Sequence, residues 1–273
     1  MDISSILGFI VGFGSIGLGY MMDGGNLIAL WMLSAFVITV GGSIGALFVS
    51  CNPRDLIRLP GMMLEVFFKP KSAIPATIEY LVLLATKARQ GGLLSLEKEI
   101  DASGVAVDPF IKRGVLMVVD GTDPEKISDV LNNDIYIYET DRTTAISMFD
   151  SFAAFAPAFG MVGTIVGLIM TLQAGMESPD MVTKAIGVAF ITTLYGVLLA
   201  NSFFIPAATK LRARMTMYRL EKEMIIEAVC AIRNGINPRM LKEQLSSYYI
   251  LGSKKQQQQQ EKPLRGVKGS KAA

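Results

Sequence analysis

Three threonine hydroxyls are the side chains most able to do chemistry inside the long apolar stretches of this sequence. Thr164 lies in one such stretch, and Thr192 and Thr193 lie in another. A hydroxyl group can both donate and accept hydrogen bonds, so it can contribute to an ion pathway. A threonine hydroxyl can equally donate to the carbonyl three or four residues earlier in its own helix, and it then only assists packing. The three positions therefore predict either an ion pathway or a packing role.

Most other chemistries are excluded by residue type. The chain has no histidine, which removes Ser-His-Asp triads, histidine-ligated zinc or haem, and histidine proton shuttles. Cys51 and Cys230 lie far apart without a Cys-x-x-Cys pattern, so we expect two reduced thiols. A phosphate-binding loop and a nucleophile elbow are also missing from the sequence. We therefore expect neither an enzyme nor a bound cofactor or metal.

Charged residues are missing from three long stretches. Between Ile3 and Pro53 the only charged residue is Asp23, and neither Ser151–Met176 nor Ala185–Thr209 contains one. Each half of the first stretch, and each later stretch, has the roughly 20 residues that a helix needs to cross a bilayer. We predict an all-α integral membrane protein with four transmembrane helices, near residues 3–22, 28–50, 151–174 and 184–207.

The predicted spans contain no aspartate, glutamate, lysine or arginine in their interior. Asp150 and Lys184 lie at the ends of the third and fourth spans, where solvent or headgroups can reach them. A protein that conducts ions alone normally carries a buried acidic or basic residue along the path. If ions pass here, the titrating carboxylate must therefore belong to another chain. The alternative is a self-sufficient channel or transporter, which would conduct ions without a partner.

Basic residues set the expected orientation. Residues 1–50 contain none, 51–150 contain eleven, 151–207 contain one and 208–273 contain fourteen. The middle segment, the tail and both termini are therefore expected in the cytoplasm. The expected organisation is a transmembrane hairpin over residues 1–50, a cytoplasmic helical domain over 51–150, a second hairpin over 151–207, cytoplasmic C-terminal helices over 208–252 and a disordered tail over 253–273.

Two charges and two prolines stand out from these elements. Arg89 and Glu97 flank a predicted helix break at the Gly91-Gly92 pair, where they could equally belong to a solvated charged face. Pro157 and Pro206 each free a backbone carbonyl within a predicted span, which permits a kink and, alternatively, a functional hinge.

A helix start is predicted at Asp123-Pro124-Glu125, which reads as an N-cap, a first-turn proline and a first-turn acid. We expect this helix to continue from the cytoplasmic part toward the third span.

Three segments of this sequence carry a resemblance to a known family. Residues 189–211 read AFITTLYGVLLANSFFIPAATKL and are similar to the fourth-span signature of the flagellar motor stator A subunit family, MotA or PomA. Residues 88–97, ARQGGLLSLE, resemble its cytoplasmic motif, and residues 156–164, APAFGMVGT, resemble its third span. With the order of hairpins and cytoplasmic parts, the resemblance extends to about Tyr249. The glutamine run Gln256–Gln260 lies outside the family pattern.

The resemblance implies a homopentamer of this chain around two copies of a MotB-like single-span B subunit in the bacterial inner membrane. The B subunit would carry the ion-binding aspartate and a peptidoglycan-binding domain. Flow of H+, or of Na+, would turn the A ring and generate torque on the rotor protein FliG. No nucleic acid or cofactor is implied.

The resemblance also assigns roles to residues of this sequence. Arg89 and Glu97 match the family's rotor-contacting charges, and Pro157 and Pro206 match its two prolines that couple ion passage to conformational change. The three threonines match positions where a hydroxyl accompanies sodium selectivity, although proton-driven relatives can also carry threonine there. The ion therefore stays open between H+ and Na+.

An energising subunit of an outer-membrane transport system, ExbB or TolQ, is the alternative within the same superfamily. Those proteins have three spans, with the large cytoplasmic part after the first. Two spans precede the cytoplasmic part in this sequence, which favours the stator subunit.

Overall fold

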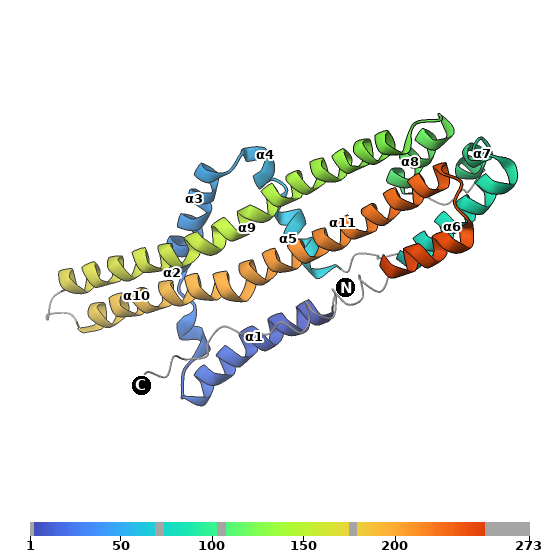
Figure 1. The fold of residues 1–273 in the computed structure, drawn as a ribbon. Coiled ribbons are helices and arrows are strands. Elements are labelled where there is room, and N and C mark those ends of the chain that lie inside the picture. Colours follow the sequence, from blue (N-terminus) through green and yellow to red (C-terminus); the bar gives the residue numbers. More distant parts are fainter. Residues whose placement is uncertain (1–2, 69–73, 103–107, 175–178, 249–273) are drawn as a thin grey trace, which may run out of the picture. The chain divides into compact units, whose positions relative to one another are not determined.

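The computed structural model describes residues 3–68, 74–102, 108–174 and 179–248, and helices are the only regular secondary structure in these ranges (Figure 1). The prediction of an all-α protein with four transmembrane helices is confirmed, because four segments are long and apolar enough to cross a membrane. These segments lie within Ser5–Met22, Leu27–Ser50, Pro124–Gln173 and Pro179–Arg233. The predicted tail, residues 253–273, lies outside the described residues.

The chain divides into two compact units. Of the described residues, those in 1–70 and 141–212 form unit 1, and those in 71–140 and 213–273 form unit 2. The helices α9 (Pro124–Ala174) and α11 (Ile205–Arg233) contribute residues to both units. The start of α9 at Pro124, and its continuation through the third predicted span, confirm the long helix expected from Asp123-Pro124-Glu125.

Unit 1 contains the apolar helices. In addition to parts of α9 and α11, its elements are α1 (Ile3–Met22), η1 (Leu27–Leu30), α2 (Leu33–Phe36), η2 (Val37–Gly41), α3 (Gly42–Ser50), α4 (Pro53–Leu56), α5 (Leu59–Phe67), α10 (Pro179–Leu199) and η3 (Ala200–Phe204). Both η2 and η3 are π-helical turns, whereas η1 is a 3₁₀ turn. In Figure 1, the unit 1 part of α9 lies side by side with α10. The helix of the fourth span begins at Pro179, five residues before the predicted start, because proline fits the first turn of a helix.

Two short helices after the second span, α4 and α5, belong to unit 1, although their sequence was assigned to the cytoplasmic domain. Ion pairs attach them to α9: Arg58 pairs with Asp141 at 2.5 Å, and Arg142 pairs with Glu65. Met62 and Val66 are buried on the inner face of α5. The boundaries between the compact units therefore lie near residues 70 and 140, inside the range 51–150.

Unit 2 has an aliphatic core of the kind found in water-soluble helical domains. Its further elements are α6 (Ile74–Gly91), α7 (Ser95–Ala102), α8 (Pro109–Val119) and a helix over residues 238–248. Leu81, Leu96 and Leu131 are completely buried and come from α6, α7 and α9, while Ile225 and Leu241 close the core from the C-terminal side. Burial of such side chains stabilises the unit through the hydrophobic effect.

A buried lysine joins two of these helices. Lys222 on α11 is only 4 % exposed and forms an ion pair with Asp108. Asp108 also accepts a hydrogen bond from the Phe110 backbone at 2.9 Å, so it caps the start of α8. The ammonium group lies 5.0 Å from the ring centres of Phe110 and Tyr218. Burial, with Tyr138 and nearby carboxylates, raises the pKa of Tyr218 to about 12, so this phenol stays neutral beside the cation.

Candidate functional site

The hydroxyls of Thr164 on α9 and Thr193 on α10 face each other. Their Oγ1 atoms are 2.5 Å apart, so one hydroxyl donates to the other. Thr164 Oγ1 lies 3.1 Å from the carbonyl oxygen of Ala189 and 3.2 Å from that of Gly160. Thr193 Oγ1 lies 3.3 Å from each of the same two carbonyl oxygens. These two hydroxyls and two carbonyls form the threonine–carbonyl cluster.

Glycine residues allow the two helices to approach closely enough to form this cluster. A Cβ atom at Gly160 would lie 3.0 Å from the carbonyl oxygen of Thr192, and one at Gly167 would lie 2.6 Å from that of Ala185. Backbone atoms cannot rotate away as the end of a flexible side chain can, so larger residues would separate the helices. Small residues have this role at many helix contacts in membranes. The short threonine side chains can therefore reach across from one helix to the other.

The Thr192 side chain lies against Gly163 of α9 and shares the Ala189 carbonyl with the cluster, but its hydroxyl bonds within its own helix. This side chain is completely buried, and its hydroxyl lies 2.8 Å from the Val188 carbonyl and 2.9 Å from that of Ala189, both in its own helix. Such a bond within one helix is the packing role that was the alternative for all three threonines. The backbone carbonyl of Thr192 instead accepts a hydrogen bond at 3.2 Å from Thr39 in the second span. Sequence reasoning missed Thr39, because nothing in its neighbours indicates which helix it faces.

The two prolines lie in continuous helices. Pro157 is inside α9, and a Cβ atom at Gly196 on α10 would lie 3.0 Å from its Cα atom. Pro206 is the second residue of α11, which directly follows the π-helical turn η3. A proline ring collides with the carbonyl four residues earlier in a regular α-helix. The wider π-turn accommodates that conflict, so the helix continues past Pro206.

The threonine–carbonyl cluster contains only uncharged oxygen atoms. Carbonyl and hydroxyl oxygens can replace the hydration shell of a cation, and hydroxyls can donate and accept protons in a hydrogen-bonded path. The described residues include no group of three or more histidine, cysteine, aspartate or glutamate side chains placed to hold a metal ion. This site can therefore solvate a passing ion. It contains no carboxylate, so it cannot supply a negative charge to bind that ion.

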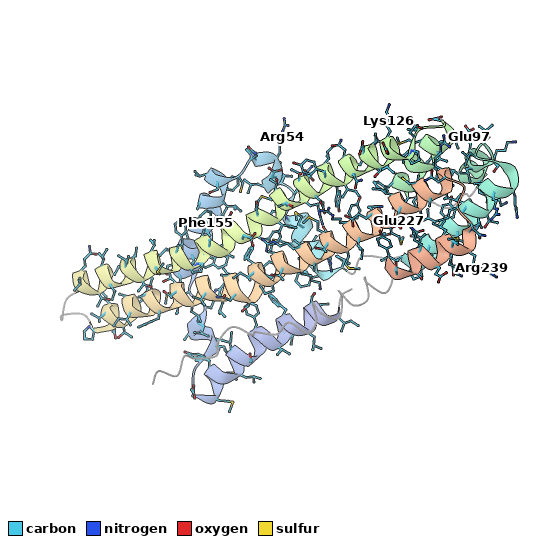
Figure 2. The ribbon with its side chains drawn as sticks, viewed as in Figure 1. Arg54, Glu97, Lys126, Phe155, Glu227 and Arg239 are labelled. Carbon is cyan, nitrogen blue, oxygen red and sulfur yellow. The ribbon has the colours of Figure 1, made fainter. Side chains whose placement is uncertain are left out.

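Arg89 and Glu97 lie on either side of a sharp turn in unit 2. Arg89 is in the last turn of α6, Glu97 is in the first turn of α7, and both side chains are exposed. Gly92 takes a φ of +77°, which favours glycine, and thus turns the chain between them. Figure 2 labels Glu97 on α7. Each charge also complements the dipole of its own helix, which is a structural reason for its position.

The turn between the two charges is held by hydrogen bonds. Ser95 Oγ donates to the Gly92 carbonyl at 2.6 Å and lies 3.2 Å from that of Lys87. Lys87 also pairs with Glu99 at 3.3 Å, which connects α6 to α7. The structure thus places Arg89 and Glu97 on one braced turn, as the sequence predicted for a break at Gly91-Gly92.

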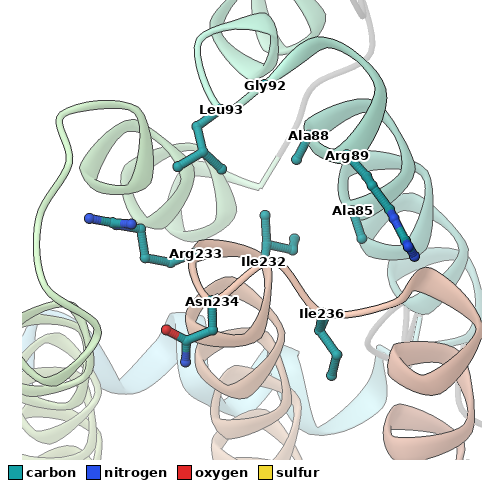
Figure 3. A pocket seen from close by; sticks show the side chains of 10 residues that line it. Ala85, Ala88, Arg89, Gly92, Leu93, Ile232, Arg233, Asn234 and Ile236 are labelled. Atoms are coloured by element: carbon teal, nitrogen blue, oxygen red, sulfur yellow. The ribbon is translucent and has the colours of Figure 1, made fainter.

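A hollow of about 310 Å³ lies beside Arg89 in unit 2 (Figure 3). Its apolar lining includes Leu93, Ile232 and Ile236. Arg233 also borders it, but its guanidinium lies 3.1 Å from each of the Gly121 and Thr122 carbonyl oxygens. The Arg89 and Arg233 side chains extend to opposite sides in Figure 3. An apolar surface therefore adjoins the exposed Arg89 charge.

Both cysteines are free thiols whose pKa values are raised above the ordinary value. Burial raises the pKa of Cys51, and the nearby Asp55 charge raises it further; burial also raises the pKa of Cys230. A thiol with a raised pKa forms little of the thiolate that acts as a nucleophile.

Two family models match this chain. The model of the MotA/TolQ/ExbB proton channel family matches residues 103–224, and the model described as Motility protein A N-terminal matches residues 6–92. The second match covers the first two predicted spans and the helices that follow them. It favours the stator subunit over the ExbB or TolQ alternative.

Relatives and solved structures match over most of the chain. Motility protein A of Borreliella burgdorferi is 38% identical over 248 residues, which cover 91% of this chain and 94% of the relative. Chemotaxis protein PomA of Vibrio alginolyticus is 32% identical over 255 residues, which cover 93% of this chain and 98% of the relative. The structure of C. jejuni MotAB matches with a TM-score of 0.84 at 29% identity, covering 91% of this chain and 96% of that chain.

Proposed function

This chain belongs to the motility protein A family of flagellar stator ion-channel subunits, and we propose that the ions that drive the motor pass the threonine–carbonyl cluster. The 2.5 Å contact between Thr164 and Thr193 carries this proposal, because it gathers four uncharged oxygens inside two apolar helices. The transported ion in this proposal is H+. The same oxygens can coordinate Na+, and sodium is the alternative that the experiments below test.

The charge that titrates comes from a partner in this proposal. The C. jejuni relative is a MotAB complex, and the spans of this chain contain no internal acid. Five copies of this chain surround two copies of a MotB-like single-span subunit whose aspartate binds the ion. Binding neutralises that aspartate and lowers the cost of moving it past α9 and α10. The membrane potential supplies about 2.3 kcal/mol per charge per 100 mV.

In this proposal, Pro157 and Pro206 couple ion passage at the threonine–carbonyl cluster to a conformational change of the helices. Each removes one backbone hydrogen bond from a membrane helix, so α9 and α11 bend there at lower cost than elsewhere. The chain lies in the bacterial inner membrane with both termini in the cytoplasm, as the distribution of basic residues favours. It acts as a channel subunit and not as an enzyme, and it needs no cofactor.

Torque reaches the rotor through Arg89 and Glu97. Both are exposed on the braced turn between α6 and α7, where they can approach charged side chains of FliG. Exposed charges of this kind act by surface complementarity and are individually worth about 1 kcal/mol or less. Several such contacts must therefore act together.

The assembly is tested by gentle purification from native membranes, with the copies counted by mass spectrometry of the intact complex. We expect a pentamer that holds a single-span protein with a membrane aspartate and a peptidoglycan-binding domain. A TonB- or TolR-like partner would overturn the proposal in favour of outer-membrane energisation. An ion-conducting oligomer without a partner would overturn both.

The ion pathway is tested with Thr164→Val and Thr193→Val, which keep the side-chain shape and remove the hydroxyls. We expect each variant to lower motor speed per stator unit at low load by about threefold, the effect of one hydrogen bond between membrane helices. Thr171→Val is the matched control, because the Thr171 hydroxyl bonds to Gly167 in its own helix. Speed measured against external pH and against sodium concentration identifies the ion. Wild-type speed in both variants would contradict the pathway.

A further inference from the structure

The second span contains two of the three completely buried polar side chains that the structure describes in unit 1. Thr39 and Ser43 are 0 % exposed, as is Thr192 on α10. Buried hydroxyls in an apolar region must form hydrogen bonds, because an unpaired one loses its bonds to water. Their partners therefore reveal what these two side chains do.

The Thr39 hydroxyl bonds to a different helix, unlike the hydroxyls of Ser50, Thr171 and Thr183. Ser50, Thr171 and Thr183 each donate to the carbonyl four residues earlier in their own helix. Thr39 instead donates to the carbonyl of Thr192 on α10, at 3.2 Å. The Thr192 carbonyl lies inside α10, where the backbone N–H four residues later already donates a hydrogen bond to it. The Thr192 carbonyl therefore does not need the bond from Thr39. The bond's consequence is to fix the position of α10 against the second span.

A π-helical turn in the second span orients the Thr39 side chain toward α10. Thr39 is the central residue of the π-helical turn η2, which inserts an extra residue into the helix and changes which face its side chains present. Ser43 Oγ donates to the Thr39 carbonyl at 2.6 Å and braces this turn. Isolated π-turns within helices are frequent at functional sites.

Further contacts hold the second span against the same two helices. The Tyr195 hydroxyl on α10 donates to the Leu30 carbonyl at 2.5 Å and accepts from the Met32 backbone at 3.1 Å. These backbone groups lie where the second span is interrupted between η1 and α2. A Cβ atom at Gly42 would lie 2.6 Å from a ring carbon of Phe159 on α9. The second span thus contacts α9 and α10 both before and after Thr39.

We propose that Thr39 is a positioning residue for the ion pathway: its hydroxyl holds the Thr192 carbonyl and thereby sets the orientation of the neighbouring Thr193 hydroxyl toward Thr164. This inference rests on the proposed function of the threonine–carbonyl cluster. Thr192 and Thr193 are consecutive, so a rotation of α10 that moved the held carbonyl would also move the Thr193 side chain. Thr39 itself is outside the cluster and touches no passing ion.

The test compares Thr39→Val, which keeps the shape and loses the hydroxyl, with Thr39→Ser, which keeps the hydroxyl. The variant chain is expressed in cells that lack the native chain, so that stator units join each motor one at a time. Each step in motor speed then measures one stator unit, independently of how many units the membrane contains. We expect Thr39→Val to lower the low-load speed per unit by about threefold, the typical effect of losing one hydrogen bond between membrane helices. Stall torque per unit is expected to remain unchanged, because the free energy per ion is unchanged. Thr39→Ser is expected to restore the speed.

Ser50→Ala is the matched control in the same span, since the Ser50 hydroxyl bonds only within its own helix at 2.8 Å. Wild-type speed per unit in Thr39→Val would overturn the inference, as would a loss confined to the number of units. A loss in Thr39→Ser equal to that in Thr39→Val would show that keeping the hydroxyl does not restore the speed, and would overturn it too. If Thr164→Val and Thr193→Val slow the motor while Thr39→Val does not, only the inference about Thr39 fails. If Thr164→Val and Thr193→Val both run at wild-type speed, the proposed ion pathway fails.

Discussion

In the spans of unit 1 the completely buried side chains are small, whereas in unit 2 most of them are large. Side chains exposed by 1 % or less within residues 27–50 and 151–207 are all alanine, serine or threonine, such as Ala35, Ala156 and Thr192. The corresponding side chains of unit 2 are mostly leucine, isoleucine and valine, with Leu81 and Leu131 as examples. The spans of unit 1 and the core of unit 2 therefore use different kinds of contact to hold their helices together.

The difference follows from the solvent around each part. In a bilayer the lipid tails are as apolar as leucine, so burying a leucine between helices yields little, and close backbone contact becomes more important. In water, burial of apolar area is itself the main stabilising term. The comparison shows that glycines hold the ion-pathway helices in register, while aliphatic side chains stabilise the part that carries Arg89 and Glu97.

The largest effect is expected from a larger side chain at the contact between α9 and α10. In Gly196→Val the new Cβ atom would meet the Ala156 carbonyl and lie 3.0 Å from Pro157 Cα. Overpacking in a core costs about 1–3 kcal/mol when side chains can adjust, and here backbone atoms are in the way. We expect no functional stator complexes, measured as complex recovered from membranes and as swimming. Gly45→Val is the control, because nothing lies within 4 Å of its Cβ position. Normal assembly of Gly196→Val would contradict the close-contact account.

A moderate effect is expected from truncating the core of unit 2. Leu131→Ala removes a completely buried side chain and is expected to destabilise unit 2 by about 2–5 kcal/mol. Hydrogen exchange in the purified complex measures the loss as faster exchange of α6, α8 and the part of α9 in unit 2. Leu172→Ala makes the same change on the same helix, at a side chain in unit 1 that is 82% exposed. It should leave exchange in unit 2 unchanged, and equal effects of both variants would remove the distinction between the units.

The sequence predicted the elements more completely than the contacts among them. Missing charges identified the four spans, because the cost of an ionisable group in lipid excludes such residues. Gly92 and Pro124 marked a turn and a helix start, because each depends on local backbone preference. The π-turns η2 and η3 were not predicted, since hydrophobic patterns carry no clear signal for one extra residue in a helix.

The candidate site was predicted in part. Thr164 and Thr193 come together as the pathway interpretation requires, but neighbouring Thr192 points its hydroxyl to its own helix. Adjacent residues point about 100° apart around a helix, so two consecutive threonines meet the neighbouring helix differently: Thr193 faces the Thr164 hydroxyl, whereas the Thr192 side chain lies against the Gly163 position of α9. Which hydroxyl meets Thr164 depends on the rotation of α10. That rotation is set by contacts with the second span, which is distant in sequence: Thr39 bonds to the Thr192 carbonyl, and Tyr195 bonds to the backbone of Leu30 and Met32.

The smallest effect is expected from reversing an exposed charge of unit 2. Arg89→Glu changes a side chain in the last turn of α6 without disturbing the aliphatic core, so folding and membrane abundance should be preserved. An exposed ion pair contributes about 1 kcal/mol or less, and the rotor contact would consist of several such pairs. We expect reduced swimming that is most evident under viscous load, and partial recovery when a facing rotor charge is also reversed. Arg239→Glu, an exposed arginine of the same unit (Figure 2), is the matched control. If Arg89→Glu swims normally under viscous load, the charge belongs to a solvated surface and the rotor contact must be sought elsewhere on unit 2.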